Sequence, residues 1–209
     1  MSAGAVRKVA ILEPVSVFAL IMAYIWVLRD GHHWWWVPIL CLMLASHGLR
    51  RERAAGLGFR LAGLEDCWRE YAPALAFAAL SLTAAGFLCQ TTRSIALNNA
   101  LLAWGAYLPW GLFQQYLLNG YFFNRLDSVF SRRAAALAAA GLFSGAHLPN
   151  WFLMALTLLA GYCCTLIYKR YQNLFFLGAA HGTIGFLVFM VVPDSISHHL
   201  KVGPGFFLR

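Results

Sequence analysis

The sequence predicts an all-α polytopic transmembrane helix bundle with about seven spans. Hydrophobic residues make up 61% of its 209 positions and charged residues only 11%, whereas a soluble domain carries about 25% charged residues. Apolar stretches of about 17–25 residues, the length that crosses a bilayer as a helix, follow one another along the chain with basic residues between them. The length suits one domain, so we expect residues 1–209 to form a single membrane domain.

The apolar stretches predict seven spans, and the first of them begins close to the N-terminus. That stretch is too long for the apolar region of a removable signal peptide and has no small-residue cleavage site, so we interpret it as a true span. The expected spans are 9–28, 33–49, 71–91, 97–123, 133–148, 150–168 and 173–192.

An arginine-rich, partly amphipathic segment runs from Arg50 to Arg69, between the second and third spans. Its apolar positions are Leu57, Phe59, Leu61 and Leu64. A segment of this kind lies at the membrane surface, and its basic side chains attract anionic lipid.

The distribution of basic residues predicts the orientation of the bundle and argues against a nucleic-acid partner. If the N-terminus is inside, twelve basic residues fall on the inner side and four, namely Arg29, Arg93, Lys201 and Arg209, on the outer side. An excess of basic residues on the cytoplasmic side is typical of membrane proteins. We therefore expect a cytoplasmic N-terminus, an outer C-terminus and contact with a lipid bilayer. The inner residues are Arg7, Lys8, Arg50, Arg51, Arg53, Arg60, Arg69, Arg125, Arg132, Arg133, Lys169 and Arg170.

The fifth span is unusual because it is short and is followed at once by Pro149 and Asn150. At 1.5 Å per residue it barely crosses a bilayer. Either the bilayer is thin there, or the helix ends inside the membrane and the turn is buried in protein. Gly141 and Gly145 form a small-residue face that allows close approach to another helix.

Polar side chains interrupt three of the apolar spans. Gln114, Gln115 and Asn119 lie in the fourth, His147 in the fifth and His181 in the seventh. A buried amide or imidazole in hydrocarbon costs several kcal/mol without a partner. Gln115 and Asn119 are four residues apart and share a helix face. The pattern favours one site inside the membrane. By helical rise, however, His147 lies further from the inner face than the other polar residues, unless its helix tilts or ends early.

Two other interpretations of these polar groups remain open. Amides and imidazoles also join membrane helices by simple hydrogen bonds. Two imidazoles could hold a metal, but no carboxylate or thiolate completes a good ligand set, so we expect no metal and no cofactor. The five cysteines show no metal spacing, and we expect them to pack in the core.

The three polar spans resemble the CPBP family of CAAX proteases and bacteriocin-processing enzymes, the glutamic-type intramembrane endopeptidases, whose motifs are E-E-x-x-x-R, F-x-x-x-H and H-x-x-x-N. Here the first reads Gln114-Gln115-Tyr116-Leu117-Leu118-Asn119, the second runs from Phe143 to His147, and the third from His181 to Gly185. The resemblance covers about residues 70–192 and implies a CPBP-like helical core.

The resemblance implies a catalytic site built from Gln114, Gln115, Asn119, His147, His181 and Gly185. In the family, the first Glu activates a water for attack on a peptide carbonyl. Gln114 takes the place of that acid, Gln115 of its neighbour, Asn119 of the Arg and Gly185 of the Asn. A Gln amide cannot accept a proton from water, so these replacements describe a neutralised site.

Two functions follow from this pattern. The protein is either an intramembrane endopeptidase of altered mechanism, with a histidine as base, or a catalytically inactive pseudoprotease that serves as scaffold, subunit or peptide-binding protein. The endopeptidase would act on membrane-associated peptides or proteins near the cytoplasmic face, and analogy favours a bacterial inner membrane. A transporter is a weaker alternative because no inverted repeat is evident. Glu13 either supplies the missing carboxylate or pairs with a basic loop at the interface.

Overall fold

The computed structural model describes residues 3–207, and within that range it contains helices and connecting segments but no strand. The expectation of an all-α fold is confirmed. The α-helices are α1 (Ala3–Ala23), α2 (Trp36–Leu49), α3 (Leu64–Leu88), α4 (Leu97–Gln115), α5 (Asn124–Asp127), α6 (Arg132–Gly145), α7 (Trp151–Tyr171), α8 (Leu174–Val191) and α9 (Asp194–Ser197). Two π-helical segments, η1 (Tyr24–Leu28) and η4 (Tyr116–Phe123), continue α1 and α4, and short 3₁₀ segments are η2 (His33–Trp35), η3 (Ala54–Leu57), η5 (His198–Leu200) and η6 (Gly203–Phe206).

A long helical segment lies at each of the seven expected spans, but only four of those in the described chain are long and apolar enough to cross a membrane on their own. These four are Arg7–Leu28, Leu64–Leu88, Trp151–Tyr171 and Leu174–Val191. The chain is therefore an integral membrane protein. The helices α2 and α6 have 14 residues each, which is shorter than the roughly 20 residues that a bilayer requires.

The expected surface segment from Arg50 to Arg69 is not one continuous amphipathic element. Its last six residues belong to α3, which begins at Leu64 rather than at 71. The preceding loop folds onto the ends of α7 and α8: Leu57 is buried, and the Leu174 amide donates to the Gly58 carbonyl at 2.9 Å. Gly58 has a φ of +96°, and a Cβ there would stand 2.7 Å from the Tyr168 ring. The loop thus closes one end of the bundle.

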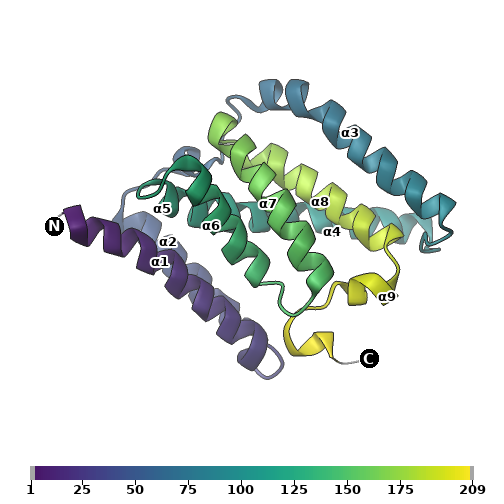
Figure 1. The fold of residues 1–209 in the computed structure, drawn as a ribbon, viewed down its shortest axis with the longest axis horizontal. Helices are drawn as coiled ribbons and strands as arrows, with labels where there is room; N and C mark the ends of the chain where they lie inside the picture. The colour runs from purple at the N-terminus through teal and green to yellow at the C-terminus, as the bar shows by residue number, and fades with distance from the viewer. Residues whose placement is uncertain (1–2, 208–209) are drawn as a thin grey trace.

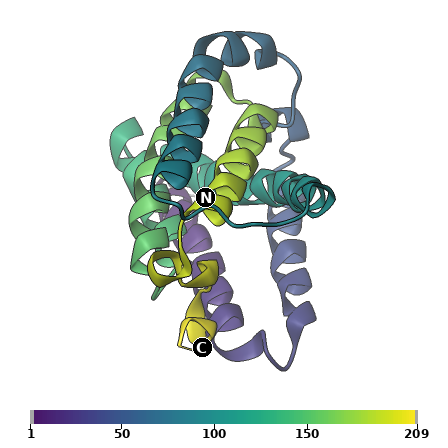
Figure 2. The same ribbon diagram turned by 90° about the vertical axis from the view of Figure 1, so that its right-hand side faces the viewer.

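The helices α3 and α4 pack against α8, and α6 packs against α7 (Figures 1 and 2). In Figure 1, α6 lies beside α7, while α3 crosses the upper right side next to α8, and α4 lies behind α8. The helices α1 and α2 form a hairpin on the side of the bundle opposite to α3 (Figures 1 and 2). The buried core follows η4, where all eight residues from Tyr116 to Phe123 are buried.

Glycines bring the backbones of α4 and α8 into direct contact. A Cβ on Gly111 would stand 2.6 Å from the Gly178 carbonyl oxygen, and one on Gly178 would stand 2.7 Å from the Leu112 Cα. Real Cβ atoms do not approach other atoms so closely, so only glycine fits at these positions. This contact fixes α4 against α8 and so aligns the polar residues of the two helices.

A buried ionic cluster joins α1, α2, the following loop and α5 at one end of η4. The Arg125 side chain is 2% exposed and binds both carboxylate oxygens of Glu52, at 2.6 and 2.9 Å, and Glu13 at 3.0 Å. Glu13 also accepts from Arg50 and from the Tyr121 hydroxyl. The carboxylates of Glu13 and Glu52 both bind Arg125, and these contacts offset the free-energy cost of burying its charge.

Candidate functional site

The first polar motif spans the junction between α4 and the π-helical segment η4. Gln114 and Gln115 are the last residues of α4, and Asn119 lies one turn further on, inside η4. Segments of π-helix are rare and occur frequently at functional sites. The Gln115 and Asn119 side chains remain in contact across this junction, since Asn119 Nδ2 donates to Gln115 Oε1 at 2.7 Å.

A row of three polar side chains runs from Asn119 through Gln115 to His181. Gln115 Nε2 lies 3.0 Å from His181 Nδ1, which joins α4 to α8. Gln115 is 1% exposed and Asn119 is fully buried. Asn119 Oδ1 has no hydrogen-bond partner among the described residues. The row brings together residues of the fourth and seventh expected spans.

His147 lies on the turn that follows α6. The helix ends at Gly145, two residues before His147, so the residue lies outside the regular helix. His147 Nδ1 lies 2.8 Å from the Phe143 carbonyl oxygen. A carbonyl only accepts, so Nδ1 carries a proton and Nε2 of the neutral ring carries a lone pair. The Phe143 ring stands 5.1 Å from the His147 ring and 6.1 Å from the His181 ring, and so links the two histidines.

A cavity of about 530 Å³ lies between α4, the turn after α6, α7 and α8. It is lined by five of the six predicted site residues, Gln114, Gln115, His147, His181 and Gly185. The sixth, Asn119, is not part of the lining and is joined to it by its hydrogen bond to Gln115. Most of the wall is apolar or aromatic, as expected for a ligand site in which a few polar groups fix orientation.

Sequence reasoning missed the C-terminal wall of the cavity. Leu200 and Val202 line it, and they belong to a segment that we call the C-terminal strap, residues 194–207. Asn150 holds the strap by donating to the Ser197 carbonyl at 2.8 Å and to the Lys201 carbonyl at 3.1 Å. Nothing in the hydropathy of these residues distinguishes a cavity wall from a surface segment.

The cysteines were also misjudged. Cys67 is buried, as expected for core packing, but Cys41 and Cys163 are exposed on their helices and Cys89 is exposed in the turn after α3. Cys164 lines the cavity. The hydrophobicity of a membrane helix does not show which of its residues are buried in protein.

No acidic side chain lines the cavity in the described part of the chain. The alternative in which Glu13 supplies the missing carboxylate is wrong, because Glu13 lies in the Arg125 cluster and pairs with Arg50, as the other alternative expected. Across residues 3–207, no three His, Cys, Asp or Glu side chains are grouped so that they could hold a metal ion. The described cavity wall therefore offers only neutral polar groups: the imidazoles and amides, together with the side chains of Tyr107, Trp110, Thr157 and Cys164.

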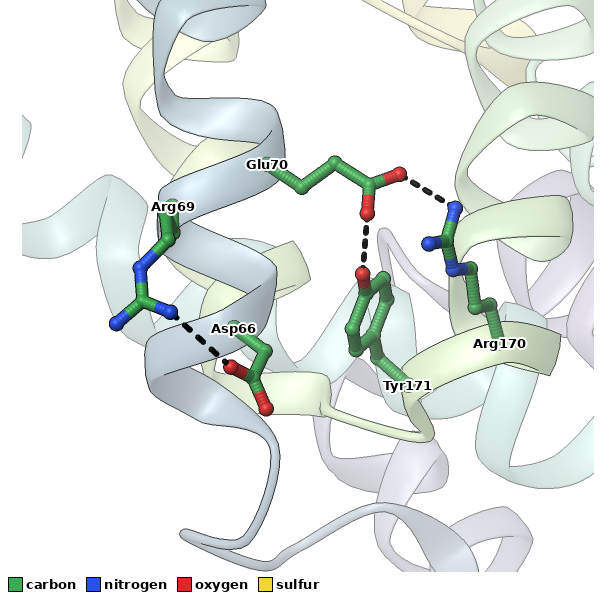
Figure 3. Close-up of a pocket in the computed structure, with 5 residues that line it drawn as sticks. All are labelled: Asp66, Arg69, Glu70, Arg170 and Tyr171. Carbon is green, nitrogen blue, oxygen red and sulfur yellow. Dashed lines mark hydrogen bonds and ion pairs between the residues drawn. The ribbon is translucent and has the colours of Figure 1, made fainter.

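A second hollow of about 510 Å³ lies between the start of α3 and the end of α7 (Figure 3). It is lined by charged and aromatic residues, namely Asp66, Arg69, Glu70, Arg170 and Tyr171. Figure 3 shows that these groups pair with one another: Glu70 accepts from Arg170 at 2.6 Å and from Tyr171, while Arg69 lies beside Asp66. It is a surface ion-pair cluster that joins the two helices.

Residues 96–187 match the family model described as type II CAAX prenyl endopeptidase, Rce1-like. This segment runs from α4 into α8 and contains all three motifs and the whole row from Asn119 to His181. Neither the curated proteins nor the solved structures gave a match to the chain.

Proposed function

Residues 96–187 place this chain in the CPBP family of type II CAAX-type intramembrane endopeptidases, and from that membership we propose that it hydrolyses membrane-associated peptides. The observation that carries the proposal is the convergence of two imidazoles and two primary amides on one mostly apolar cavity. Charge stabilisation by fixed donors is stronger next to apolar walls than in bulk water. The expected position of the site is near the cytoplasmic face of the membrane.

His147 is the base in this proposal. Its Nδ1 proton is held by the Phe143 carbonyl, which leaves the Nε2 lone pair on a ring that lines the cavity. Nε2 takes a proton from water as the water oxygen attacks the peptide carbonyl carbon. The same proton then passes to the leaving nitrogen as the C–N bond breaks. A neutral imidazole with a free lone pair can perform both steps, because it accepts the proton first and donates it afterwards.

The amides serve to hold the substrate carbonyl and its developing negative charge. Gln114 lines the cavity, and the Gln115 amide nitrogen carries a second N–H beyond the one directed at His181. Donors fixed at such a position contribute about 10²–10³-fold each to the rate of acyl transfer. The residues keep the shape of a carboxylate pair while acting as donors.

The absence of a carboxylate from the described cavity wall favours a second candidate function. A pseudoprotease would keep the cavity and bind a membrane peptide without cleaving it. The two functions differ in whether an imidazole replaces the missing acid. Binding without turnover is the expected behaviour of the second.

The test is hydrolysis of membrane-anchored peptides by the full chain reconstituted in lipid vesicles. We expect His147→Ala to lower turnover at least about 10²-fold, the usual contribution of a general base. The exposed His32, which does not line the cavity, provides the matched control in His32→Ala. Unchanged turnover in both His147→Ala and His181→Ala would remove the proposal.

If the wild type binds peptide but does not hydrolyse it, Gln114→Glu combined with Gln115→Glu separates the two functions. Gain of hydrolysis in that variant supports the pseudoprotease, since only the acid was missing. The remaining proposals are a cytoplasmic N-terminus and a bacterial inner membrane. Reporter fusions at the two ends of the chain test the orientation.

A further inference from the structure

We propose that Asn119 is a positioning residue that sets the tautomer of His181 through Gln115, so that His181 presents an N–H at Nε2. Asn119 does not line the cavity, and its side chain is joined to the site by the hydrogen bond to Gln115. The proposal rests on the proposed function for its catalytic consequence, whereas the tautomer itself is a property of the resting protein.

The tautomer follows from the direction of the hydrogen bonds. The group that lies 3.0 Å from His181 Nδ1 is the Gln115 amide nitrogen, which donates and cannot accept. His181 Nδ1 must therefore accept, so it carries no proton. A neutral imidazole has one N–H, and on His181 it is at Nε2. No residue in the range 3–207 is seen to accept from that Nε2 in the structure.

Asn119 determines which way the Gln115 amide faces. Asn119 Nδ2 donates to Gln115 Oε1 at 2.7 Å, which turns Gln115 Nε2 toward the imidazole. The reverse arrangement needs both amides to turn, and it would bury the Asn119 NH₂ group without an acceptor. The observed arrangement leaves only the acceptor Asn119 Oδ1 without a partner. Buried donors without partners are rarer in proteins than buried acceptors without partners.

The two histidines consequently have opposite hydrogen-bonding properties at Nε2: one nitrogen accepts and the other donates. His147 has its proton on Nδ1, at the Phe143 carbonyl, and offers a lone pair at Nε2. His181 accepts at Nδ1 and offers a donor at Nε2. One ring is therefore suited to take a proton and the other to stabilise a negative oxygen. Environments that separate two titratable groups in this way assign the acid and base roles.

The experiment is ¹⁵N NMR of histidine-labelled full chain in lipid nanodiscs, with His181→Gln used to assign the His181 signals. The two tautomers have different nitrogen shifts, and the wild type is expected to show His181 with its proton on Nε2. Asn119→Leu keeps the volume and removes the donor. We expect it to lower the ratio of the Nε2–H to the Nδ1–H form about 2- to 12-fold, the ratio that one ordinary hydrogen bond sustains.

Asn124 provides the matched control, because it lies one turn beyond Asn119 and donates to Gly120 and Tyr168 rather than to Gln115. Asn124→Leu is expected to leave the His181 signals unchanged. Asn119→Ala replaces the leucine variant if the latter does not fold. A wild-type His181 with its proton on Nδ1, or an unchanged ratio in the Asn119 variants, overturns the proposal. Neither readout needs a peptide or turnover, so loss of the proposed function leaves this inference standing.

Discussion

Gly182 lies so close to Tyr107 that a Cβ on the glycine would stand 2.6 Å from the Tyr107 carbonyl oxygen. Gly182 directly follows His181, and Tyr107 lies two turns before Gln115 on α4. The contact between α4 and α8 therefore holds the two halves of the hydrogen-bonded row at bonding distance. A side chain at this point would separate the helices and open the row.

Gly182→Ala should destabilise the protein by about 1–3 kcal/mol, the typical cost of adding a methyl group to a well-packed site. The atoms in the way belong to the backbone of α4, which cannot move aside as a flexible side chain could. Thermal unfolding in detergent measures the effect. Gly105→Ala is the control, since nothing lies within 4 Å of a Cβ there, and it should stabilise α4 by up to about 1 kcal/mol. Equal melting temperatures for the two variants would contradict the close contact.

Arg125→Met should cost about 3–5 kcal/mol, the usual result of removing one partner of a buried ion pair. It leaves Glu13 and Glu52 without their shared cation. Chemical unfolding of the reconstituted protein measures the loss. Arg69→Ala removes an ion pair on an exposed helix surface and should change stability by no more than about 0.5 kcal/mol. A comparable loss of stability in both variants would show that the buried Arg125 cluster contributes no more to stability than an exposed ion pair.

The contribution of Glu52 to the stability of the folded protein should fall in acid. Burial by itself would raise the pKa of Glu52, but the hydrogen bonds from Arg125 and His47 and the charge of Arg125 outweigh it, so the pKa is lowered. A carboxyl with a lowered folded-state pKa stabilises the protein above its unfolded pKa of about 4.5. That stabilisation is lost as the pH falls through the folded-state pKa.

Melting temperature measured from pH 7 down to pH 3 checks this dependence. The wild type should lose stability from about pH 4.5 downward. In Glu52→Gln the neutral amide does not titrate. The variant should therefore be less stable at pH 7, and its melting temperature should fall less between pH 4.5 and pH 3 than that of the wild type. Parallel curves for the two proteins would show that Glu52 does not contribute to the acid response.

The positions of the helices were predictable from hydropathy because apolar runs in a membrane protein mark spans directly. The observed helix ends differ from the predicted ones where packing sets them. For example, α3 starts at Leu64 because residues 50–63 fold onto the bundle instead of forming a surface helix. The candidate site was predictable because Gln114 and His181 are polar residues in apolar helices and His147 ends an apolar run, which is a strong signal.

The remaining parts of the site carry no such signal. Leu200 and Val202 line the cavity only because Asn150 and neighbouring groups hold the C-terminal strap against it. Such a contact between residues about 50 positions apart depends on the tertiary fold rather than on local pattern. The placement of Glu13 was likewise undecided, since a single acid near the end of a span can face either a cavity or a basic loop.

Asn150→Ala should release the C-terminal strap. The fully buried Asn150 side chain donates to two strap carbonyls and also accepts from the Leu153 amide at the start of α7. Within the strap, His198, His199 and Leu200 have φ values of 49°, 55° and 55°. A left-handed conformation costs about 1–2 kcal/mol per non-glycine residue, so the strap keeps this shape only while its anchoring hydrogen bonds hold.

Hydrogen exchange of the strap amides measures the release, and residues 197–203 should exchange faster in Asn150→Ala than in the wild type. Loss of the helix cap alone costs about 0.5–2 kcal/mol, so a control must remove an equivalent cap. Asn173 caps α8 through the Phe176 amide and donates to the Arg60 carbonyl, away from the strap. Asn173→Ala should therefore lower stability and leave strap exchange unchanged. Faster strap exchange in both variants would mean that general destabilisation, not the loss of the Asn150 contacts, opens this wall of the cavity.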